Sequence, residues 1–286
     1  MPDFGIFRGF NEKLFGDKLV AGQLPTELGF IGSADFSTDV DALAFFARVT
    51  TAGGTLSDIE KLAIDTLVRQ MKDDNIWTKM KAIYPMVGAS AAACAQNLKS
   101  SSFTGTFNGG WTFANTGVTP NGTSAYMDTG VNPNSSLQLN SVHFSNYFPS
   151  FTIEEKCQIG VIDGSDGLYS FWRYNTSNAF HRLNSNTEAL PRSAHGASGF
   201  NIATRTSSSS NSAYVNNVEI ATSTTASSAL PNYNMFISAR NVSGAAGSFS
   251  SLEQSFASIG DGLTSTEASD FYTAVQAFQT TLSREV

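Results

Sequence analysis

Charged residues are scarce in this chain. Asp, Glu, Lys and Arg together make up 14% of its 286 residues, against roughly 25% in ordinary globular proteins. The chain must therefore draw its solubility from Ser, Thr and Asn, which suits extended β proteins and components of larger assemblies. The net charge of −7 argues against a nucleic-acid partner, because proteins that bind nucleic acid present a basic face.

Cysteine and long apolar runs are also rare. The two cysteines, Cys94 and Cys157, lack the spacing of a disulfide framework. We expect both to be small buried apolar residues, although a disulfide between them stays open. No stretch approaches 18 apolar residues, so we expect no membrane-spanning helix. The first residues show no basic region followed by an apolar run, so we also expect no secretion signal.

Motifs for catalysis and for metal binding are missing. The chain has no His-Glu-x-x-His pair and no phosphate-binding Gly-Lys-Ser/Thr turn, and its three histidines are scattered. We therefore expect no catalytic residues, no metal ion and no cofactor. One acidic turn, residues 163–167, could supply oxygens to calcium, but Asp and Gly suit such a turn without a metal.

Phenylalanine and glycine stand out in residues 1–35. Glycine raises the conformational entropy of a free segment, whereas phenylalanine gains much from burial. The segment is therefore predicted to be an extended attachment arm that becomes ordered on a neighbouring subunit. A disordered tail, or a strap across its own domain, stays open. The residues predicted to make the attachment are Phe4, Phe7, Phe10, Phe15 and Phe30.

Residues 36–99 are predicted to form a small helical module. Ser57 stands three residues before Glu60, and Thr264 stands three residues before Glu267. Each pair is a capping box, which marks the start of a helix. The second box opens a C-terminal helix over 264–283, which should pack against the sandwich or the front helices. In the module, apolar residues at helical spacing predict helices at 39–49, 57–71, 75–84 and 89–98.

From residue 100 onward the pattern changes to short alternating strands separated by turns. Ser207–Ser210 is predicted to be a hairpin tip, and Asn216-Asn217 a tight turn. The fold class expected is mainly β: an antiparallel jelly-roll sandwich over 100–286 that includes the last helix. The predicted strands are 151–161, 168–174, 179–183, 200–206, 212–215, 219–222 and 234–240.

Several stretches together carry a family resemblance: residues 52–57, 76–88, 117–130, 213–217 and 256–263, followed by the last helix. In this order they resemble bacteriophage and prophage structural proteins of the head-fibre or tail-appendage type. The C-terminal domain of that group looks like a concanavalin A-like, or laminin G-like, sandwich. The resemblance covers roughly residues 50–286.

The resemblance implies a virion structural protein made in the bacterial cytoplasm. It would be a capsid head fibre, a decoration protein or a tail appendage. Its arm would bind capsid or tail proteins of the same phage, and the chain would form a homo-oligomer. An internal head or tail component stays open as an alternative.

A concanavalin A-like sandwich also implies a possible host adhesin that binds a surface glycan. Sugar sites use aromatic faces and hydrogen-bonding side chains, so bulky residues on one predicted strand and its neighbour are candidates. In the competing interpretation, Leu168, Trp172 and Tyr174 fill the core while the other side chains cover it. The candidate glycan contacts are Tyr169, Trp172, Arg173, Tyr174 and His181.

A glycan-cleaving enzyme is the second sugar-related alternative. Glycosidases need two carboxylates that flank one scissile bond. Glu154 and Glu155 are the only acidic cluster on a predicted strand, and neighbouring strand residues point to opposite faces. The pair could not cooperate, so we expect no such activity.

Overall fold

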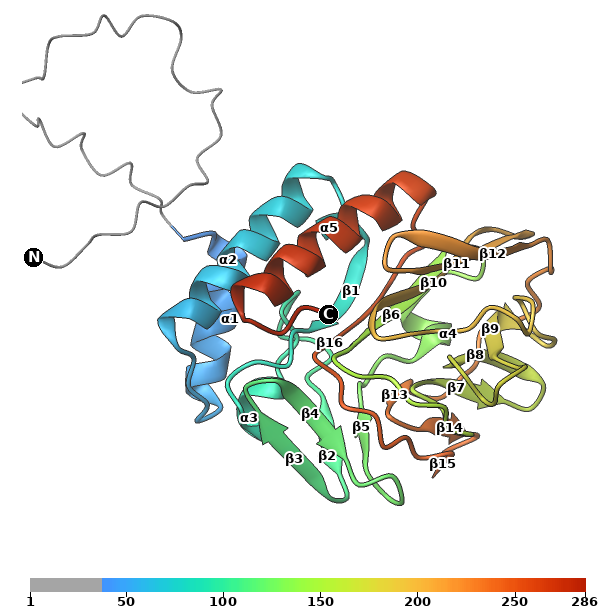
Figure 1. Cartoon of the computed structure of the whole chain (residues 1–286), viewed down its shortest axis with the longest axis horizontal. Helices are drawn as coiled ribbons and strands as arrows, with labels where there is room; N and C mark the ends of the chain where they lie inside the picture. Colours follow the sequence, from blue (N-terminus) through green and yellow to red (C-terminus); the bar gives the residue numbers. More distant parts are fainter. Residues whose placement is uncertain (1–37) are drawn as a thin grey trace, which may run out of the picture. The chain divides into compact units, whose positions relative to one another are not determined.

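Two β-sheets lie face to face in residues 38–286, the part of the chain that the computed structural model describes, and helices cover the outer face of one sheet (Figure 1). These residues form one compact unit. The fold is a mainly antiparallel β-sandwich with a C-terminal helix, as the sequence predicts. The attachment arm, residues 1–35 with Phe4, Phe7, Phe10, Phe15 and Phe30, lies outside the described residues.

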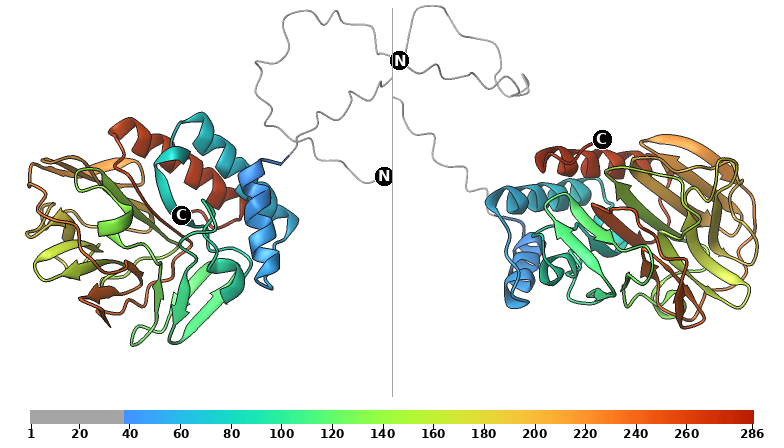
Figure 2. Two further views of the ribbon diagram at one scale, coloured as in Figure 1. Left: turned by 180° about the vertical axis from the view of Figure 1, so that it is seen from behind. Right: turned by 60° about the horizontal axis from the view of Figure 1, so that its bottom comes forward.

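Three helices form the covering layer: α1 (Val40–Thr51), α2 (Asp58–Asp73) and α5 (Ser265–Thr281). Both predicted capping boxes are present. Ser57 and Glu60 cap α2 in both directions, and Thr264 and Glu267 do the same for α5. Each box satisfies backbone N–H groups that have no partner inside the helix. Figure 2 shows α2 and α5 side by side from two further directions.

The helix layer is held to its sheet by aromatic packing. Phe271 and Phe278 of α5 lie against Phe200 and Phe256 of the strands, and the ring centroids of Phe200 and Phe271 are 5.1 Å apart at nearly right angles. Edge-to-face pairs of this kind add to the gain from burial. The C-terminal helix therefore packs on both the sandwich and the front helices.

The helix predicted at residues 75–84 is wrong. A short 3-10 turn, η1 (Trp77–Lys79), leads directly into strand β1 (Met80–Tyr84). This strand pairs with β16 (Phe256–Gly260), and the two faces of the resulting sheet bury Ile83 toward the helices and Tyr84 toward the other sheet. Pairing with a strand distant in sequence overrides the local helical spacing. Residues 38–99 thus belong to the same compact unit as the sandwich.

The six-stranded sheet has the order β1-β16-β6-β10-β11-β12, with every neighbour antiparallel. The predicted hairpin tip joins β10 to β11, and the predicted turn joins β11 to β12. Asn216 and Asn217 have φ values of 48° and 66°, as a two-residue hairpin turn requires. The remaining bounds are β6 (Val142–Phe148), β10 (Gly199–Ser207), β11 (Ser210–Val215) and β12 (Val218–Ser223).

The eight-stranded sheet has the order β15-β14-β7-β13-β5-β2, with β8 paired to β7 and β9 to β8. Strand β14 runs parallel to β7, and the other pairs are antiparallel. The bounds are β2 (Thr106–Asn108), β5 (Tyr126–Asp128), β7 (Ile159–Asp163), β8 (Asp166–Phe171), β9 (Phe180–Ser185), β13 (Phe236–Ile237), β14 (Arg240–Val242) and β15 (Ala245–Gly247).

Three short elements complete the described residues: the hairpin of β3 (Trp111–Ala114) and β4 (Gly117–Pro120), and the one-turn helices α3 (Ala91–Cys94) and α4 (Pro133–Ser136). Helix α3 lies inside the range predicted for a short third helix. Among residues 38–286, no helix combines the length and apolarity needed to span a bilayer.

The core between the sheets includes a hydrogen-bonded polar chain. The indole Nε1 of Trp172 donates to Asn146 (3.1 Å), whose amide donates to Gln254 (2.7 Å), and Gln254 donates to Ser238 (2.8 Å). All four side chains are buried, so these bonds offset the cost of removing polar groups from water. Apolar residues of both sheets surround these hydrogen-bonded side chains, among them Phe144, Leu183 and Ile259.

Both cysteines are buried free thiols, so the disulfide alternative is wrong and the expected burial is confirmed. Cys94 lies in the core between the sheets and Cys157 in a separate cluster on the outer face of the eight-stranded sheet. Burial raises the pKa of each thiol to about 12. The reactive thiolate form is therefore disfavoured.

Candidate functional site: an aromatic pocket on the eight-stranded sheet

A pocket of about 420 Å³ lies on the outer face of the eight-stranded sheet. Its floor follows from the two-residue period of β8. Leu168 and Trp172 point into the core between the sheets, whereas Tyr169 and Phe171 belong to the outer cluster. The pocket is lined by Glu155, Tyr169, Phe171, Tyr174, Phe180, Glu188, Arg240 and Ser248.

Four aromatic rings form one connected surface in this pocket. The centroids of Tyr169 and Phe171 are 5.5 Å apart, those of Phe171 and Tyr174 6.1 Å, and those of Tyr174 and Phe180 5.0 Å. Each pair is close to edge-to-face, the arrangement that aromatic side chains favour. Tyr174 and Phe180 are only partly buried. Part of the aromatic surface therefore remains available to a ligand.

A partly buried carboxylate stands beside the rings. Glu188 Oε1 accepts a hydrogen bond from the Tyr169 hydroxyl (3.2 Å) and lies 3.6 Å from Arg182 Nε. Burial raises the pKa of the Glu188 carboxyl. Its second oxygen, Oε2, is enclosed and has no hydrogen-bond partner among the described residues. This oxygen can accept a hydrogen bond from a hydroxyl group of a bound molecule.

A guanidinium group stands on the same rings. The centre of the Arg240 guanidinium lies 5.2 Å from the ring centroids of both Tyr169 and Phe171. This geometry is that of a cation–π contact. Together, the rings, the free carboxylate oxygen and the guanidinium offer an apolar surface with a few polar groups beside it. This is the usual composition of a small-molecule site.

The structure divides the five predicted glycan contacts. Tyr169 and Tyr174 line the pocket, and Arg173 is partly buried but does not line it. Trp172 and His181 are fully buried, so neither side chain can touch a ligand at the surface. Because strand residues alternate between faces, Trp172 necessarily faces the core when Tyr169 and Phe171 face outward. The competing interpretation, in which Trp172 is a core residue, is therefore correct for this side chain.

Sequence reasoning missed Phe171, Phe180, Glu188 and Arg240. The spacing of Tyr169 and Phe171 was a usable signal, because residues two apart on a strand share a face. Phe180 stands opposite Phe171 on the paired strand β9. Nothing local to Glu188 or Arg240 indicates a site, since they reach the pocket from segments far apart in sequence.

The strand predicted over 151–161 begins only at Ile159. Glu154 instead lies in a preceding loop, where its carboxylate accepts hydrogen bonds from Ser250 Oγ, Ser251 N (2.9 Å) and Gln158 Nε2 (2.9 Å). These bonds tie the loop to a distant segment and explain why it leaves the sheet. The range predicted as one strand over 234–240 instead contains β13 (Phe236–Ile237) and, after a break, the first residue of β14 (Arg240–Val242). Glu154 supports structure, while its neighbour Glu155 is exposed and lines the pocket.

The acidic turn at residues 163–167 connects β7 to β8. Asp166 accepts a hydrogen bond from Ser228 Oγ, and Asp163 accepts one from Asn232 N (3.3 Å). The carboxylates thus hold a neighbouring loop. Within residues 38–286, no group of three or more His, Cys, Asp or Glu side chains is arranged to hold a metal ion.

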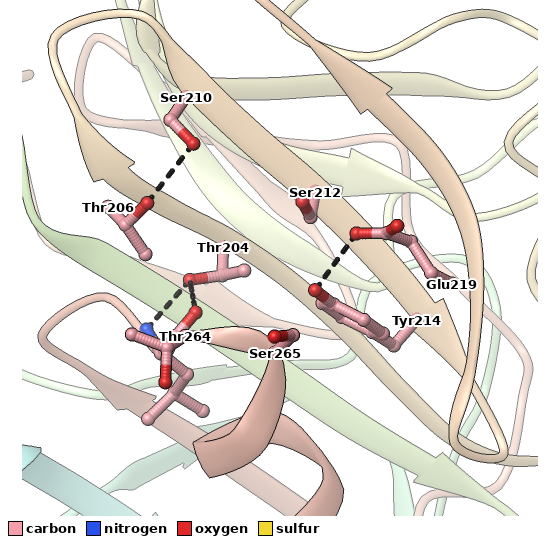
Figure 3. A pocket seen from close by; sticks show the side chains of 9 residues that line it. Thr204, Thr206, Ser210, Ser212, Tyr214, Glu219, Thr264 and Ser265 are labelled. Carbon is pink, nitrogen blue, oxygen red and sulfur yellow. Dashed lines mark hydrogen bonds between the residues drawn. The ribbon is translucent and has the colours of Figure 1, made fainter.

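A second pocket, of about 260 Å³, lies on the six-stranded sheet beside the start of α5 (Figure 3). Hydroxyl groups dominate it, but many are already paired. Thr204 Oγ1 accepts from Leu263 N (2.8 Å), Thr206 donates to Ser210 (3.2 Å), and Tyr214 donates to Glu219 (3.0 Å). Because these groups satisfy one another, the aromatic pocket is the stronger candidate site.

Comparison with known proteins supports the fold. No family model matches the chain, and no curated protein matches it. Domain 4 of AbnA, a GH43 extracellular arabinanase from Geobacillus stearothermophilus solved with arabinotriose, aligns with a TM-score of 0.50 at 14% identity, over 68% of this chain and 98% of that domain. A mutant Trypanosoma rangeli sialidase with trans-sialidase activity aligns with a TM-score of 0.43 at 15% identity, over 75% of this chain and 39% of the sialidase. At these identities, the likeness to the arabinanase domain establishes a shared β-sandwich fold.

Proposed function

We propose that this chain is a carbohydrate-binding structural protein that holds a glycan in the aromatic pocket. The observation that carries the proposal is the connected surface of Tyr169, Phe171, Tyr174 and Phe180 beside an unpaired Glu188 oxygen. A sugar ring has an apolar C–H face that can lie on aromatic rings and hydroxyl groups that can donate to a carboxylate. The arabinanase domain of similar fold was solved with arabinotriose, which agrees with this proposal.

We further propose binding without cleavage. The pocket contains two carboxylates, Glu155 and Glu188, but Glu188 is committed through Oε1 to Tyr169 and Arg182. These contacts suit Glu188 to positioning a ligand hydroxyl more than to transferring a proton during cleavage. Glu154, the other predicted acid, has both carboxylate oxygens engaged by neighbouring residues. Glu155 is the unengaged acid of the pocket, and the engaged Glu188 is not expected to act as its partner in a glycosidase pair.

Replacing Tyr174 with alanine should weaken glycan binding about tenfold and leave the fold intact. Tyr174 is partly exposed and contributes one face of the pocket. Losing contact over roughly 50 Å² of apolar surface costs about 1.3 kcal/mol, which corresponds to about a tenfold higher Kd. Binding is measured on a glycan array and then by titration calorimetry with the best-bound oligosaccharide.

The matched control is Tyr233→Ala, because Tyr233 is an exposed tyrosine outside the pocket. This variant should bind like the unmodified protein. Equal affinity of the Tyr174→Ala variant would show that the pocket is not the sugar site. The same incubations are examined for new reducing ends. Their appearance, and their loss on Glu188→Gln, would make the site catalytic and contradict binding without cleavage.

We also propose that the sandwich is displayed on a phage particle as part of a homo-oligomer. The sequence resemblance and the low charge of the chain support this proposal. Large apolar side chains on the helix layer support it as well: Val40 and Leu43 on α1, and Ile59 and Leu62 on α2, are all more than half exposed. Exposed apolar residues of this kind suit contact with another protein. Helix α1 lies immediately after the predicted attachment arm.

Deleting residues 1–35 should leave a folded, glycan-binding protein that no longer enters particles. The deletion keeps every residue of the described cores, which run from Ala42 onward. Incorporation is measured by immunogold electron microscopy of purified virions, with antibody against residues 100–260. We expect label on intact virions that carry the full-length protein. Normal incorporation of the deletion variant would contradict the role of the arm, and label only after disruption would indicate an internal component.

A further inference from the structure

Arg240 has no anionic partner in the described structure. Its guanidinium makes no ion pair or hydrogen bond with any residue of 38–286, and its Nε is enclosed without an acceptor. The contacts it does make are with the ring faces of Tyr169 and Phe171. An arginine with unsatisfied donors on the wall of a pocket is chemically suited to bind an anion.

The other arginines near these rings differ from Arg240. Arg182, whose guanidinium lies 5.6 Å from the Tyr169 ring, is already engaged by the Ser165 carbonyl and lies 3.6 Å from Glu188. Arg192 stands 4.6 Å from the Phe180 ring but is exposed at the edge. Arg240 is the guanidinium that both lines the pocket and keeps its donors unused.

The local charge differs from that of the chain as a whole. The chain carries a net charge of −7, yet Arg182, Arg192 and Arg240 stand over the rings of this pocket or its edge. The two carboxylates are Glu188, which lies near Arg182, and Glu155, which is exposed. Solvent screens the exposed Glu155 more than a partly buried group. The inner wall of the pocket therefore favours an anion at Arg240.

We propose that the pocket selects an anionic sugar residue, whose carboxylate or sulfate group is held by the guanidinium of Arg240. The inference rests on the proposed glycan-binding function and adds the chemical class of the glycan. The planar guanidinium donates two parallel hydrogen bonds to such a group. The sugar ring lies on Tyr174 and Phe171, and a ring hydroxyl donates to Glu188 Oε2.

The test is an array that carries neutral, uronate-bearing, sialylated and sulfated oligosaccharides. We expect binding to the anionic members, and weaker binding as salt rises. The best-bound carboxylated glycan is then measured beside its methyl ester, which keeps the sugar and removes only the charge. Esterification should raise Kd about ten- to a hundredfold. A preference for the sulfated members over the carboxylated ones would identify the anion as sulfate.

The variant Arg240→Gln should produce the same loss as esterification, and the two losses should not add, because both remove one interaction. Arg240→Lys should bind with intermediate affinity, since lysine keeps the charge without the fork. Arg69→Gln, on helix α2, is the matched control and should bind normally. Thermal melts establish that each variant is folded.

The outcomes separate the two proposals. If neutral glycans bind and Arg240→Gln leaves their Kd unchanged while Tyr174→Ala raises it, the pocket binds sugars but the anionic class is wrong. If no array member binds the full chain, the glycan-binding function is wrong and the inference falls with it. If Arg240→Gln loses binding of anionic glycans while the control Arg69→Gln retains it, the glycan-binding function and the anionic class are both supported.

Discussion

Replacing Arg284 with alanine should lower the free energy of unfolding by about 4 kcal/mol. Arg284 is buried, although the residues on either side of it are exposed. Its guanidinium donates to Gln279 Oε1 (2.8 Å) and to the carbonyls of Met86 (2.9 Å), Pro85 (3.2 Å) and Ser255 (3.2 Å). One side chain thus joins α5, the segment after β1 and the segment before β16.

The size of the effect follows from the acceptors that alanine would leave behind. Each buried polar group without a partner costs about 1–3 kcal/mol. The loss is reduced because a buried charge is removed as well: burial lowers the pKa of Arg284 to about 10, a sign of its desolvation cost. A net loss of about 4 kcal/mol corresponds to a Tm lower by about 10 °C for a chain of this size.

The measurement is urea unfolding of the Arg284→Ala variant beside Glu285→Ala. Glu285 is the exposed neighbour, so its replacement should change the free energy of unfolding by less than about 0.5 kcal/mol. Arg284→Lys should fall between the two, because an ammonium group cannot reach all of these carbonyls. Equal stability of Arg284→Ala and Glu285→Ala would show that the carbonyl cluster contributes nothing measurable.

Local signals in the sequence predicted local structure well. The capping boxes at Ser57 and Thr264 are present, and the hairpin turn at Asn216-Asn217 has the required positive φ values. These features depend on residues within a few positions of one another. The alternation of apolar residues similarly indicated strands β8 to β12 and parts of β7 and β13, because one face of each is buried. It did not indicate the central strand β6 or its neighbour β16, which are buried along their whole length.

Features that depend on distant partners were not predictable. Strand β1 exists because β16, far away in sequence, pairs with it. The polar residues around Arg284 give no local sign of burial, yet four segments supply its acceptors, the fourth being the β3–β4 turn through the Asn115 carbonyl (3.5 Å). The same holds for the pocket: Tyr169 could be proposed from strand bulk, whereas Arg240 meets it only through the parallel pairing of β14 with β7.

Acidification from pH 7 to pH 5 should lower the free energy of unfolding by about 4 kcal/mol through two buried histidines. His143 Nδ1 lies 2.6 Å from the Asp261 carbonyl and Nε2 lies 3.1 Å from Ser258 Oγ. His181 lies 2.9 Å from both Ser170 Oγ and the Ala194 carbonyl. Since a carbonyl only accepts, the ring nitrogen that faces it carries a proton, and in the neutral ring the other nitrogen accepts from the serine hydroxyl.

Burial lowers the pKa of His143 and of His181 to about 4, whereas a histidine in the unfolded chain has a pKa near 6.5. Between these values the unfolded chain binds protons that the folded chain does not. The free energy of unfolding therefore falls as pH decreases through this window. The stability contributed by the neutral histidines is complete above about pH 6.5. Each histidine contributes a loss of about 2 kcal/mol by pH 5.

Other titrating groups are separable from the histidines. Burial alone would raise the pKa of Glu267. The Lys79 ammonium (Nζ to Glu267 Oε2, 2.5 Å) and the hydrogen bonds from Thr264 stabilise the carboxylate more strongly, so the pKa of Glu267 is lowered overall. Its contribution is thus lost only below about pH 4.5. Glu188, whose pKa is raised by burial, works in the opposite direction, because its contribution to stability increases as pH falls and offsets part of the histidine loss. The pH 5–7 window excludes Glu267, and Glu188 is present in every variant, so differences between variants report on His143 and His181.

The experiment compares urea unfolding at pH 7, 6 and 5 for His143→Gln, His181→Gln and the double variant. Each substitution also costs stability at neutral pH, but the difference between pH 7 and pH 5 within one variant excludes that cost. Each single variant should show about half of the unmodified protein's loss, and the double variant almost none. If the double variant still lost about 4 kcal/mol, protons taken up elsewhere would cause the acid sensitivity, and the two rings would be charged in the folded protein. Because His143 lies under α5 and His181 under the aromatic pocket, the single variants also show which face of the sandwich is the more acid-sensitive.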